Sequence, residues 1–569
     1  MATFGDNSID ALYHNSWAGY TQTPIRLTYS FLKTIPADAT AKDALGFAPM
    51  TAAQQAATKS AMAAWSAVAN ITYAEVASGG IMGIATNDQG DESGGYASYP
   101  NGDRTIYLYT NNKGDYNFQF AAGDYGRHVL LHELGHMLGL KHPGDYTDDP
   151  TAHHQGPYLP TSTDNQDYTV MSYHTGANWA LNGNFDISPM LYDIQAVQLL
   201  YGANMSYHAG ADQYRFVKDS APQCIWDAGG SDTLDFSRCT DEVFINMMAG
   251  TFSSTAPGYD NVSIAYNVTI EAAIAGSGGS TIFGNQAGNS ITGGAGSDRI
   301  YLGSGNDSVN GGGGSDTVVY FEAFGDYAVS GIQAALTVEG KGIDVLKRIS
   351  TLEFSDRTIQ LSGYGAIHGA TVGADAFIAG AGSELFSGGA GTDTIAYNGE
   401  RGNFAVSGGG NSFTVTDKTG AGGVDLVGGV ERLLFSDGSG VALDVDGHTG
   451  QAYRLYQAAF DRTPDLPGMG FWLSYLDNGM SLQTMSQNFL QSNEGVAAYG
   501  SLNDAQFVTA LYDNVLHRAP EAAGFAFHVG NLAAGAYSRA VLLMGFSESP
   551  ENRAALVGVT GNGIEFTVF

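Results

Sequence analysis

Three histidines and one glutamate stand close together in the sequence, in types and at spacings that suit metal chemistry. On a helix, His132 and His136 lie one turn apart on the same face, so both imidazoles can reach one ion while Glu133 points to a water beside it. Gly139 lets the helix stop and the chain turn, which brings His142 round as a third ligand. Three protein ligands leave a fourth position open, which is typical of a catalytic rather than a structural zinc. The alternative is an ordinary amphipathic helix that carries histidines.

A second pair of histidines with the same spacing precedes the first. His128 and His132 are also four residues apart, so they too share a helix face. Only the later pair has glutamate directly after its first histidine and a Gly-x-x-His after its second. We therefore expect His128 on the helix surface, outside the metal site.

The elements that must hold this cluster follow from hydrophobic periodicity and helix-capping residues. Alternating apolar residues predict strands, and Thr51 is a suitable N-cap for an alanine-rich helix with Trp65 on its buried side. Strands are expected at 24–31, 71–76, 81–85 and 104–109, and helices at 51–69, 126–139 and 189–201. This pattern predicts an α+β domain, a twisted sheet packed on two helices. Residues 95–100 are expected near the edge strand, against which a peptide could extend.

Glycine-rich nonapeptides form a second candidate for metal chemistry. They run in phase from 275 to 319 and return from 370 to 396, with polar residues at the sixth position. Those residues are Ser280, Asn289, Asp298, Asp307 and Asp316, then Asp375, Glu384 and Asp393. Two nonapeptides make one coil of a parallel β-roll, so Asp298 and Asp316 stack on one edge and Asp307 lies on the other. The alternative is a flexible glycine-rich linker.

Calcium would bind between successive loops of such rolls. Carboxylates and loop carbonyls are the oxygen ligands that calcium prefers. Without the ion the stacked carboxylates should repel one another, and the thin roll should unfold. Asp232, in the upstream stretch 225–234, is a further calcium candidate.

A methionine and a tyrosine beyond the histidines carry a family resemblance. Met171 and Tyr173 lie in the stretch 168–173, and across roughly residues 10–360 the chain resembles serralysins, which are metzincin zinc metalloproteases with RTX calcium-binding repeats. The resemblance implies that Met171 forms a methionine turn beneath zinc on His132, His136 and His142. It also implies that Tyr173 is an additional, switchable zinc ligand.

The expected reaction is endopeptide hydrolysis of protein or peptide substrates. Glu133 would remove the proton of the attacking water and return it to the departing amine, while Tyr173 would hydrogen-bond the developing oxyanion. From another class of function, the chain could be a calcium-dependent cell-surface or S-layer-associated binding protein whose protease domain is vestigial.

Composition excludes several partners. With 24 basic and 57 acidic side chains, the formal net charge of -33 disfavours nucleic acid and anionic membranes and suits divalent cations. No run of about 18 apolar residues exists, and the first residues lack the features of a cleavable signal peptide. Secretion by another route stays open, and the serralysin resemblance implies the type I (ABC) machinery. Cys224 and Cys239 either pair after export or stay as two buried thiols.

The last part of the chain changes character after about residue 447. Its apolar spacing becomes helical, and its residues recur at an offset near 56, which indicates a duplicated helical module. The module resembles uncharacterised helical repeats of bacterial exported proteins and would serve packing or cell-surface attachment. The end, 564–569, places an acidic residue before an apolar tail, as in serralysins, where the type I machinery reads a C-terminal signal. A frayed terminus is the alternative.

Together these patterns predict a secreted, extracellular, multidomain protein. An α+β metzincin catalytic domain would span 1–205, and an RTX β-roll and β-sandwich domain would span 206–360. A second, shorter RTX unit would follow at 361–446, and an all-α module would occupy 447–569.

Overall fold

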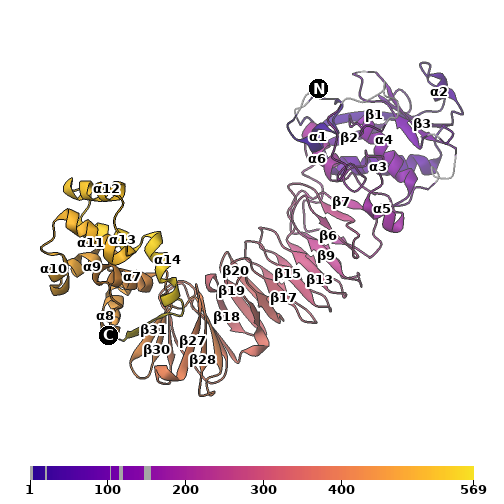
Figure 1. Ribbon diagram of the computed structural model, residues 1–569. Coiled ribbons are helices and arrows are strands. Elements are labelled where there is room, and N and C mark those ends of the chain that lie inside the picture. The colour runs from indigo at the N-terminus through magenta and orange to yellow at the C-terminus, as the bar shows by residue number, and fades with distance from the viewer. Residues whose placement is uncertain are drawn as a thin grey trace. The chain divides into compact units, whose positions relative to one another are not determined.

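The computed structural model describes residues 4–19, 22–91, 93–102, 104–113, 119–146 and 156–568 (Figure 1). These residues fold as two compact units, Met1–Val318 and Val319–Phe569. Within the described ranges, no helix is both long and apolar enough to cross a membrane. The division into four domains stays a prediction.

The first unit begins with a five-stranded sheet in the order β2-β1-β3-β5-β4, parallel except for β4 at its edge. Its strands are β1 (Ile25–Phe31), β2 (Ile71–Glu75), β3 (Met82–Asn87), β4 (Gly95–Ala97) and β5 (Ile106–Asn111). The helices are α1 (Asn7–Asp10), α2 (Ala41–Ala44), α3 (Ala52–Val68), α4 (Tyr125–Met137), α5 (Ala177–Asn182) and α6 (Leu191–Tyr201). The expected strands and helices are present, with ends shifted by up to two residues.

One feature determines where α3 begins, and another holds it against α4. Thr51 caps α3 in a capping box with Gln54, so the helix begins where expected. Trp65 is fully buried, and its indole Nε1 donates to the Leu131 carbonyl of α4 at 3.2 Å. The helix that carries the histidines is therefore held from behind by a core aromatic side chain.

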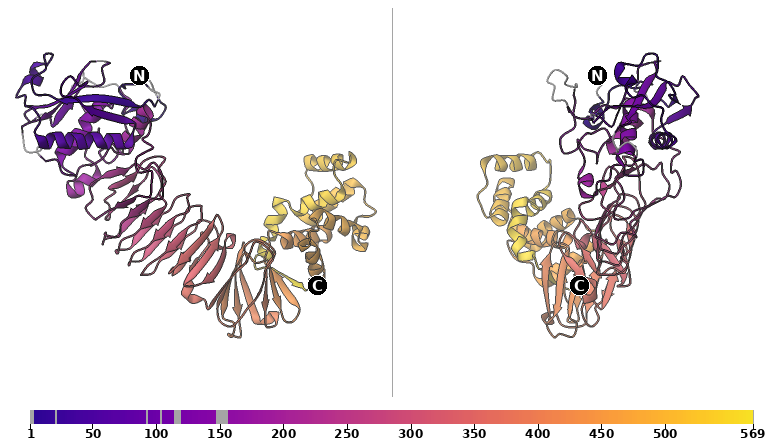
Figure 2. Two further views of the ribbon diagram at one scale, coloured as in Figure 1. Left: turned by 180° about the vertical axis from the view of Figure 1, so that it is seen from behind. Right: turned by 90° about the vertical axis from the view of Figure 1, so that its right-hand side faces the viewer.

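A parallel β-roll occupies the rest of the first unit (Figure 2). Its strands alternate between two sheets, ordered β6-β8-β12-β14-β16 and β9-β13-β15-β17, while β7, β10 and β11 form a small separate sheet. The strands are β6 (Gln213–Arg215), β7 (Gln223–Ile225), β8 (Thr233–Asp235), β9 (Val243–Asn246), β10 (Phe252–Ser253), β11 (Val262–Ile264), β12 (Ala272–Ile274), β13 (Ser280–Phe283), β14 (Ser290–Thr292), β15 (Asp298–Tyr301), β16 (Ser308–Asn310) and β17 (Thr317–Val319).

The roll confirms the nonapeptide prediction. The apolar eighth residues are buried between the two sheets, namely Ile282, Ile291, Ile300, Val309 and Val318. Strands two repeats apart pair in register, as Ile282 with Ile300 and Ile291 with Val309 show. One coil therefore consists of two nonapeptides, and a flexible linker is excluded.

The second unit contains a shorter roll that hairpins extend into broader sheets. Two five-stranded sheets have the orders β23-β25-β29-β28-β27 and β24-β26-β30-β31-β32, and β18-β19-β20 form a meander. The strands are β18 (Ala328–Ile332), β19 (Ala335–Glu339), β20 (Ile343–Lys347), β21 (Thr351–Glu353), β22 (Thr358–Gln360), β23 (Ala366–Gly369), β24 (Ala376–Ile378), β25 (Glu384–Ser387), β26 (Thr394–Tyr397), β27 (Phe404–Gly409), β28 (Ser412–Asp417), β29 (Val424–Gly428), β30 (Arg432–Phe435), β31 (Ser439–Ala442) and β32 (Ile564–Thr567). Between the two sheets lies a core that includes Phe386, Ile395, Phe413 and Leu433.

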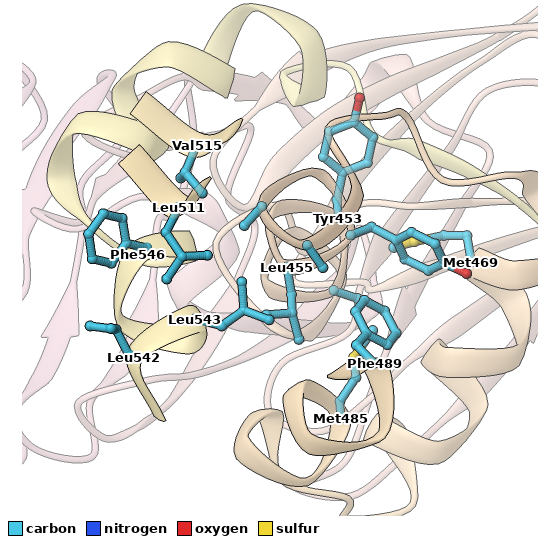
Figure 3. Packing of buried hydrophobic residues seen from close by; sticks show 14 of the residues in the cluster. Tyr453, Leu455, Met469, Met485, Phe489, Leu511, Val515, Leu542, Leu543 and Phe546 are labelled. Carbon is cyan, nitrogen blue, oxygen red and sulfur yellow. The ribbon is translucent and has the colours of Figure 1, made fainter. Parts of the chain in front are cut away.

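Eight helices complete the described part of the second unit. They are α7 (His448–Phe460), α8 (Leu466–Asp477), α9 (Leu482–Gln491), α10 (Asn493–Tyr499), α11 (Asp504–Leu516), α12 (Ala522–Ala533), α13 (Arg539–Ser547) and α14 (Pro550–Thr560). Leu455, Phe489, Leu511, Leu543 and Phe546 meet in one core between them (Figure 3). The predicted parallel β-roll and helical C-terminal module are therefore confirmed.

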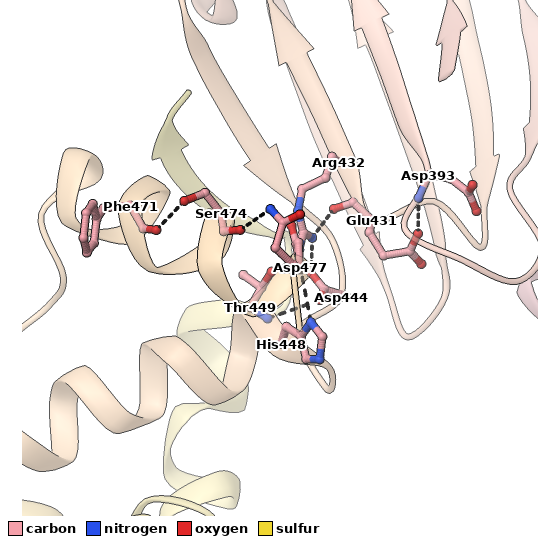
Figure 4. A network of polar contacts seen from close by, with 10 residues as sticks. Asp393, Glu431, Arg432, Asp444, His448, Thr449, Phe471, Ser474 and Asp477 are labelled. Carbon is pink, nitrogen blue, oxygen red and sulfur yellow. Dashed lines mark hydrogen bonds and ion pairs between the residues drawn. The ribbon is translucent and has the colours of Figure 1, made fainter. Parts of the chain in front are cut away.

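The C-terminal strand ties the helical module to the second roll. Ile564–Thr567 pairs antiparallel with β31, and Ile564 and Phe566 are buried. A frayed end is thus wrong for these residues. The Arg432 guanidinium of β30 adds ion pairs to Asp444 at 2.5 Å and to Asp477 of α8 at 2.7 Å (Figure 4). Because Arg432 is only 5% exposed, these carboxylates are needed to balance its buried charge.

Candidate active site

The structure brings three histidines of the first unit together at the end of α4. The Nε2 atom of His142 lies 3.1 Å from Nε2 of His132 and 3.0 Å from Nε2 of His136. Gly139 makes the turn between them with a φ of +100°, and a Cβ there would lie 2.0 Å from the Asn15 carbonyl oxygen. Only glycine therefore fits the position that swings His142 back toward the helix.

Backbone carbonyls fix the tautomers of two of these imidazoles. Nδ1 of His132 lies 2.7 Å from the Val170 oxygen, and Nδ1 of His136 lies 2.8 Å from the Leu140 oxygen. A carbonyl only accepts, so each Nδ1 carries the proton and donates. In the neutral rings, the lone pairs of both Nε2 atoms then point into the cluster. Burial and the neighbouring rings also hold the pKa of His132 well below its usual range.

This donor set fits a zinc ion. Three nitrogens about 2.1 Å from one tetrahedral ion lie roughly 3.4 Å from each other, within a few tenths of an ångström of the separations found here. The Nε2 lone pairs of His132 and His136 both point at Nε2 of His142, an arrangement in which three imidazole nitrogens can share one cation. His132, His136 and His142 are also one of two groups of metal-ligand type among the described residues.

Glu133 lies beside the cluster with an unsatisfied carboxylate oxygen. Its side chain is buried, and Oε2 has no hydrogen-bond partner among the residues that the structure describes. Burial raises the pKa of Glu133 to about 8. A Cβ on Gly95 would lie 3.1 Å from Cγ of Glu133, so glycine in β4 leaves room for this side chain. A carboxyl group whose pKa lies near neutral pH can both accept and return a proton.

Tyr173 stands at the open side of the cluster. Its ring centroid lies 4.3 Å from that of His142 and 5.7 Å from that of His132, and the residue is 58% exposed. Partial burial, followed by the charge of Glu133, raises the pKa of Tyr173 to about 12, so the hydroxyl keeps its proton. The Tyr146 ring stacks on that of Tyr173 with the ring centroids 4.8 Å apart, and it also lies 5.8 Å from the His142 ring.

Met171 forms the floor of the site. It is fully buried, and a Cβ on Gly135 of α4 would lie 2.5 Å from its Sδ. The sulfur therefore packs directly against the helix backbone, between the turns that carry His132 and His136. This is the place that the resemblance gives to a methionine turn.

Asp193 holds this turn in place, a role that its sequence position alone did not predict. Its carboxylate accepts from the Thr169 hydroxyl at 2.6 Å, from the Val170 N–H at 2.8 Å and from the Met190 N–H at 2.9 Å. The side chain is fully buried, and burial raises the pKa of Asp193 to about 7 against these hydrogen bonds. Val170 is thereby positioned to accept from His132.

The expectation for His128 was wrong. This residue is 4% exposed, its Nδ1 lies 2.9 Å from Asp186, and the Gln166 amide lies 3.3 Å from its Nε2. Gln166 also donates to the Ser172 carbonyl at 3.3 Å. Residues 156–186 cover this face of α4, which helix periodicity alone could not show. His128 braces the loop before Tyr173 rather than facing solvent.

A cleft of about 430 Å³ opens between the edge strand β4 and the metal-ligand cluster. It is lined by Gly94, Gly95, His132, Glu133, Tyr173 and Phe185, among others. On its far side β4 pairs with β5, and its other side is the open edge of the sheet, where the N–H of Gly95 donates to the Ser93 hydroxyl at 3.2 Å and an extended peptide could add as a further strand. The cleft therefore has the shape and position for a peptide backbone beside the zinc candidates.

The sixth-position carboxylates of the first roll form ladders. The backbone N–H of Asp298 donates to Asp316 at 2.9 Å, and that of Asn289 donates to Asp307 at 2.6 Å, so the two edges separate as predicted. Asp298 Oδ1 and Asp316 Oδ2 are buried without a hydrogen-bond partner among the described residues. Burial raises the pKa of Asp316 to about 6. Unpaired buried carboxylate oxygens are expected where a cation binds.

The second roll repeats the ladder with two residues that the nonapeptide phase does not include. Asp375 N–H donates to Asp393 at 2.8 Å, but the next acceptors are Asp425 for Glu384 at 2.9 Å and Glu431 for Asp393 at 2.7 Å (Figure 4). The hairpin of β27 and β28 separates these partners in sequence. The sequence did contain a signal for these two partners. Asp425 is the second residue of β29, and Glu431 directly precedes β30.

Of these carboxylates, Asp393 most resembles the ladder residues of the first roll. Its Oδ2 is buried without a partner in the described part of the chain. Glu384 instead accepts from Gly380 N–H at 2.7 Å and lies 3.2 Å from Nε2 of His368, while Asp375 accepts from Thr371 N–H at 2.7 Å. The two residues thus have neighbours that already satisfy part of their charge.

Asp232 begins the first ladder. It is fully buried, it accepts from Asp212 N–H at 2.9 Å, and its own N–H donates to Glu271 at 2.7 Å. Its Oδ2 has no partner within the described ranges. The second group of metal-ligand type, His208, Asp212 and Asp227, includes the same Asp212. Asp232 is therefore placed like the other calcium candidates.

The two cysteines do not pair. Cys224 and Cys239 are free and buried, and burial raises the pKa of Cys224 to about 12 and that of Cys239 to about 11. The interpretation as two buried thiols is the one that the structure supports.

Comparisons with known proteins match three segments. Residues 192–406 match the model of the peptidase M10 serralysin C-terminal family, and residues 448–498 and 486–556 match a domain of unknown function, DUF4214. Metallopeptidase AprA of Pseudomonas marginalis is 37% identical over 297 residues, which cover 47% of this chain and 61% of that protein. Serralysin of Proteus mirabilis is 38% identical over 265 residues, which cover 40% of this chain and 53% of that protein.

A solved structure, the extracellular lipase LipA from Serratia marcescens, covers 27% of this chain and 38% of its own at 16% identity. Its TM-score is 0.10. From the sequence relatives, the chain is similar to serralysin-type metalloproteases over about half of its length, and residues 192–406 match the serralysin C-terminal family. It spans only 61% and 53% of the lengths of the two relatives named above, so its own activity and substrates do not follow from this similarity.

Proposed function

We propose that this protein is a zinc-dependent endopeptidase that hydrolyses peptide bonds in proteins. The observation that supports it most is the cluster of His132, His136 and His142, whose Nε2 atoms meet beside the unpaired carboxylate oxygen of Glu133. Three such ligands leave a position open for water and substrate. The cleft along β4 supports a peptide as that substrate.

Each side chain has a step that its position allows. His132, His136 and His142 would hold zinc, which when bound lowers the pKa of a water and polarises the scissile carbonyl. Glu133 takes the proton of the attacking water and delivers it to the departing amine. The Tyr173 hydroxyl, which keeps its proton at neutral pH, donates a hydrogen bond to the oxygen that gains charge in the transition state.

We further propose that calcium binds the ladders and completes the fold of both rolls. The candidates are Asp232, Asp298, Asp307, Asp316, Asp375, Glu384 and Asp393. Partnerless buried oxygens on Asp232, Asp298, Asp316 and Asp393 support this. By family resemblance, the folding would follow export to the extracellular medium by the type I secretion machinery. Attachment to a cell surface through the helical module belongs to the same proposal.

The test of the enzyme is cleavage of casein by the purified chain with calcium and zinc. Glu133→Gln keeps the size of the side chain but cannot accept the proton, so kcat should fall by about 10²- to 10⁴-fold. Calcium-dependent circular dichroism should not change, which separates lost chemistry from lost fold. Equal cleavage by the wild type and Glu133→Gln would contradict the assignment.

A second function is a calcium-dependent surface-binding protein with a vestigial protease domain. The second roll and the added helical module, which go beyond a single protease and roll, favour it. No cleavage by the wild type, together with calcium-dependent binding to bacterial cells, would decide for this function.

A further inference from the structure

The helical module consists of two structural copies that can be compared residue by residue. The Arg462 guanidinium lies 5.4 Å from the Tyr456 ring, and that of Arg518 lies 5.1 Å from the Tyr512 ring. A Cβ on Gly468 or on Gly524 would meet the hydroxyl of the tyrosine in its own copy, at 2.6 and 2.5 Å. Helices α7 and α8 thus correspond to α11 and α12 at an offset of 56.

The last two helices of each copy correspond at an offset of 57. Ser481 and Ser538 cap α9 and α13, and Ser492 and Ser549 cap α10 and α14. The extra residue falls in the loop after α12, where the second copy has Tyr537. Phe489 therefore corresponds to Phe546 (Figure 3).

In the first copy, an indole ring fills the space between these helices. The Trp472 ring centroid lies 5.1 Å from that of Phe489, which in turn lies 4.8 Å from Tyr456 and 5.2 Å from Phe460. Trp472 also hydrogen-bonds the side chain of Tyr456. Trp472 is thus a part of the module's core.

In the second copy, three of the corresponding residues are smaller. His528 replaces Trp472, Leu516 replaces Phe460, and Gly545 replaces Asn488. The two aromatic neighbours are kept, with the Phe546 ring 5.0 Å from that of Tyr512 and 5.3 Å from that of His528. The structure has a cavity of about 340 Å³ at this place. Its lining residues are Tyr512, Leu516, Phe527, His528, Tyr537, Val541, Leu542, Gly545, Phe546 and Ser549.

The cavity has aromatic walls and one polar pair. His528 Nδ1 lies 2.8 Å from the Tyr537 hydroxyl, which the inserted residue supplies. Burial lowers the pKa of His528, so the ring is neutral at physiological pH. Phe527, 62% exposed, stands at the rim. Mostly apolar cavities of about this volume with a few placed polar groups are typical small-ligand sites.

We propose that this cavity binds a free, neutral aromatic molecule about the size of an indole. Its shape follows from the first copy, in which the same walls enclose Trp472 of the chain itself. Its chemistry follows from the lining, which offers ring faces at Tyr512 and Phe546 and a hydrogen-bonding group at His528. A charged ligand would lose its hydration with no opposite charge in the lining to replace it.

The test is calorimetric titration of the full chain in calcium with indole as the probe. Two variants restore residues of the first copy, His528→Trp and Gly545→Asn. Both should fold, because the first copy packs with these side chains, and each should weaken indole binding at least tenfold. Ala526→Trp adds the same ring to an exposed position of α12 outside the cavity, so it should leave the affinity unchanged.

Two further titrations test what kind of ligand the cavity accepts. The first asks whether the ligand needs an aromatic ring, and the second asks whether the ring must come from a free molecule or from a peptide. Cyclohexanol, which lacks ring faces, should bind at least tenfold more weakly than indole. Binding of a tryptophan-containing peptide without binding of free indole would overturn the proposal and make the cavity a docking site for protein chains. No indole binding by the wild type, or equal binding by His528→Trp with an unchanged melting temperature, would also overturn it.

Discussion

The histidine cluster and the roll ladders are both candidate metal sites, but they differ in what holds them together without an ion. In the cluster, backbone carbonyls fix the imidazoles of His132 and His136, and burial holds the pKa of His132 well below its usual range. In the ladders, buried carboxylates such as Asp298 and Asp316 stack with oxygens that nothing described satisfies. The first is built by the protein itself, whereas the second lacks the charge that would balance it.

This difference separates two uses of a metal. A preorganised neutral site costs little when empty, so its ion contributes chemistry more than folding. A roll whose core is one apolar residue per strand gains little from burial, so removing a charge-balancing ion should cost it much of its stability. Zinc is thus expected to control activity, and calcium to control the fold.

Metal removal is the largest effect that this comparison predicts. The protein is dialysed against EDTA, and then calcium or zinc alone is returned. Calcium alone should restore the β signal in circular dichroism without casein cleavage, since the rolls refold and the histidine cluster stays empty. Zinc alone should restore neither, because thiolate-free carboxylate ladders prefer calcium.

Two results would break the comparison. A β signal that does not change on EDTA treatment would show that the rolls hold without calcium. Recovery of the signal with zinc alone would show that the ladders are not selective.

The Asp193→Ala variant tests how much the surrounding protein, rather than the ion, positions the zinc ligands. Asp193→Ala removes the acceptor of three donors, from Thr169, Val170 and Met190. Each buried donor left unpaired costs about 1–3 kcal/mol, so the free energy of unfolding should fall by roughly 3 kcal/mol or more. Zinc affinity should fall by about 10- to 100-fold, since Val170 orients His132. Urea unfolding in calcium and competition with a zinc chelator measure the two effects.

Asp193→Asn is the matched control. It keeps one carbonyl oxygen as an acceptor, so its loss of stability should be smaller than that of alanine. If alanine leaves zinc affinity unchanged while lowering stability, the turn at Met171 supports the fold but does not orient the ligands.

The sequence predicted those parts of this contrast that depend on local spacing. The i, i+4 histidines, the turn at Gly139 and the nine-residue phase of Asp298, Asp307 and Asp316 each follow from chain geometry over a few residues. The strands β1, β2, β3 and β5 and the helix α3 also followed from periodicity and capping.

Contacts between distant segments were not predictable in this way. His128 was misplaced because the segment that buries it, with Gln166 and Asp186, lies tens of residues away. Asp425 and Glu431 were missed because a hairpin interrupts the repeat, so the roll resumes out of phase. In each case the missing information is a tertiary contact that carries no local period.

The smallest predicted effect concerns pH and tests the ladders without any ion. Burial raises the pKa of Glu431 from its usual 4.5 to about 7, so between these values the folded state keeps a proton that the unfolded chain has lost. The calcium-free second roll is therefore stabilised below about pH 4.5, and it loses that contribution as the pH rises through 7. In EDTA, with sucrose added to keep the calcium-free rolls folded, the melting temperature should fall from pH 5 to pH 8 more in the wild type than in Glu431→Gln, whose amide does not ionise. In a domain of 150–250 residues, a loss of about 1 kcal/mol in the free energy of unfolding lowers the melting temperature by roughly 2–4 °C. Calcium should reverse the trend, because it binds the ionised carboxylate, and equal slopes for both proteins in EDTA would remove Glu431 from the ladder's electrostatics.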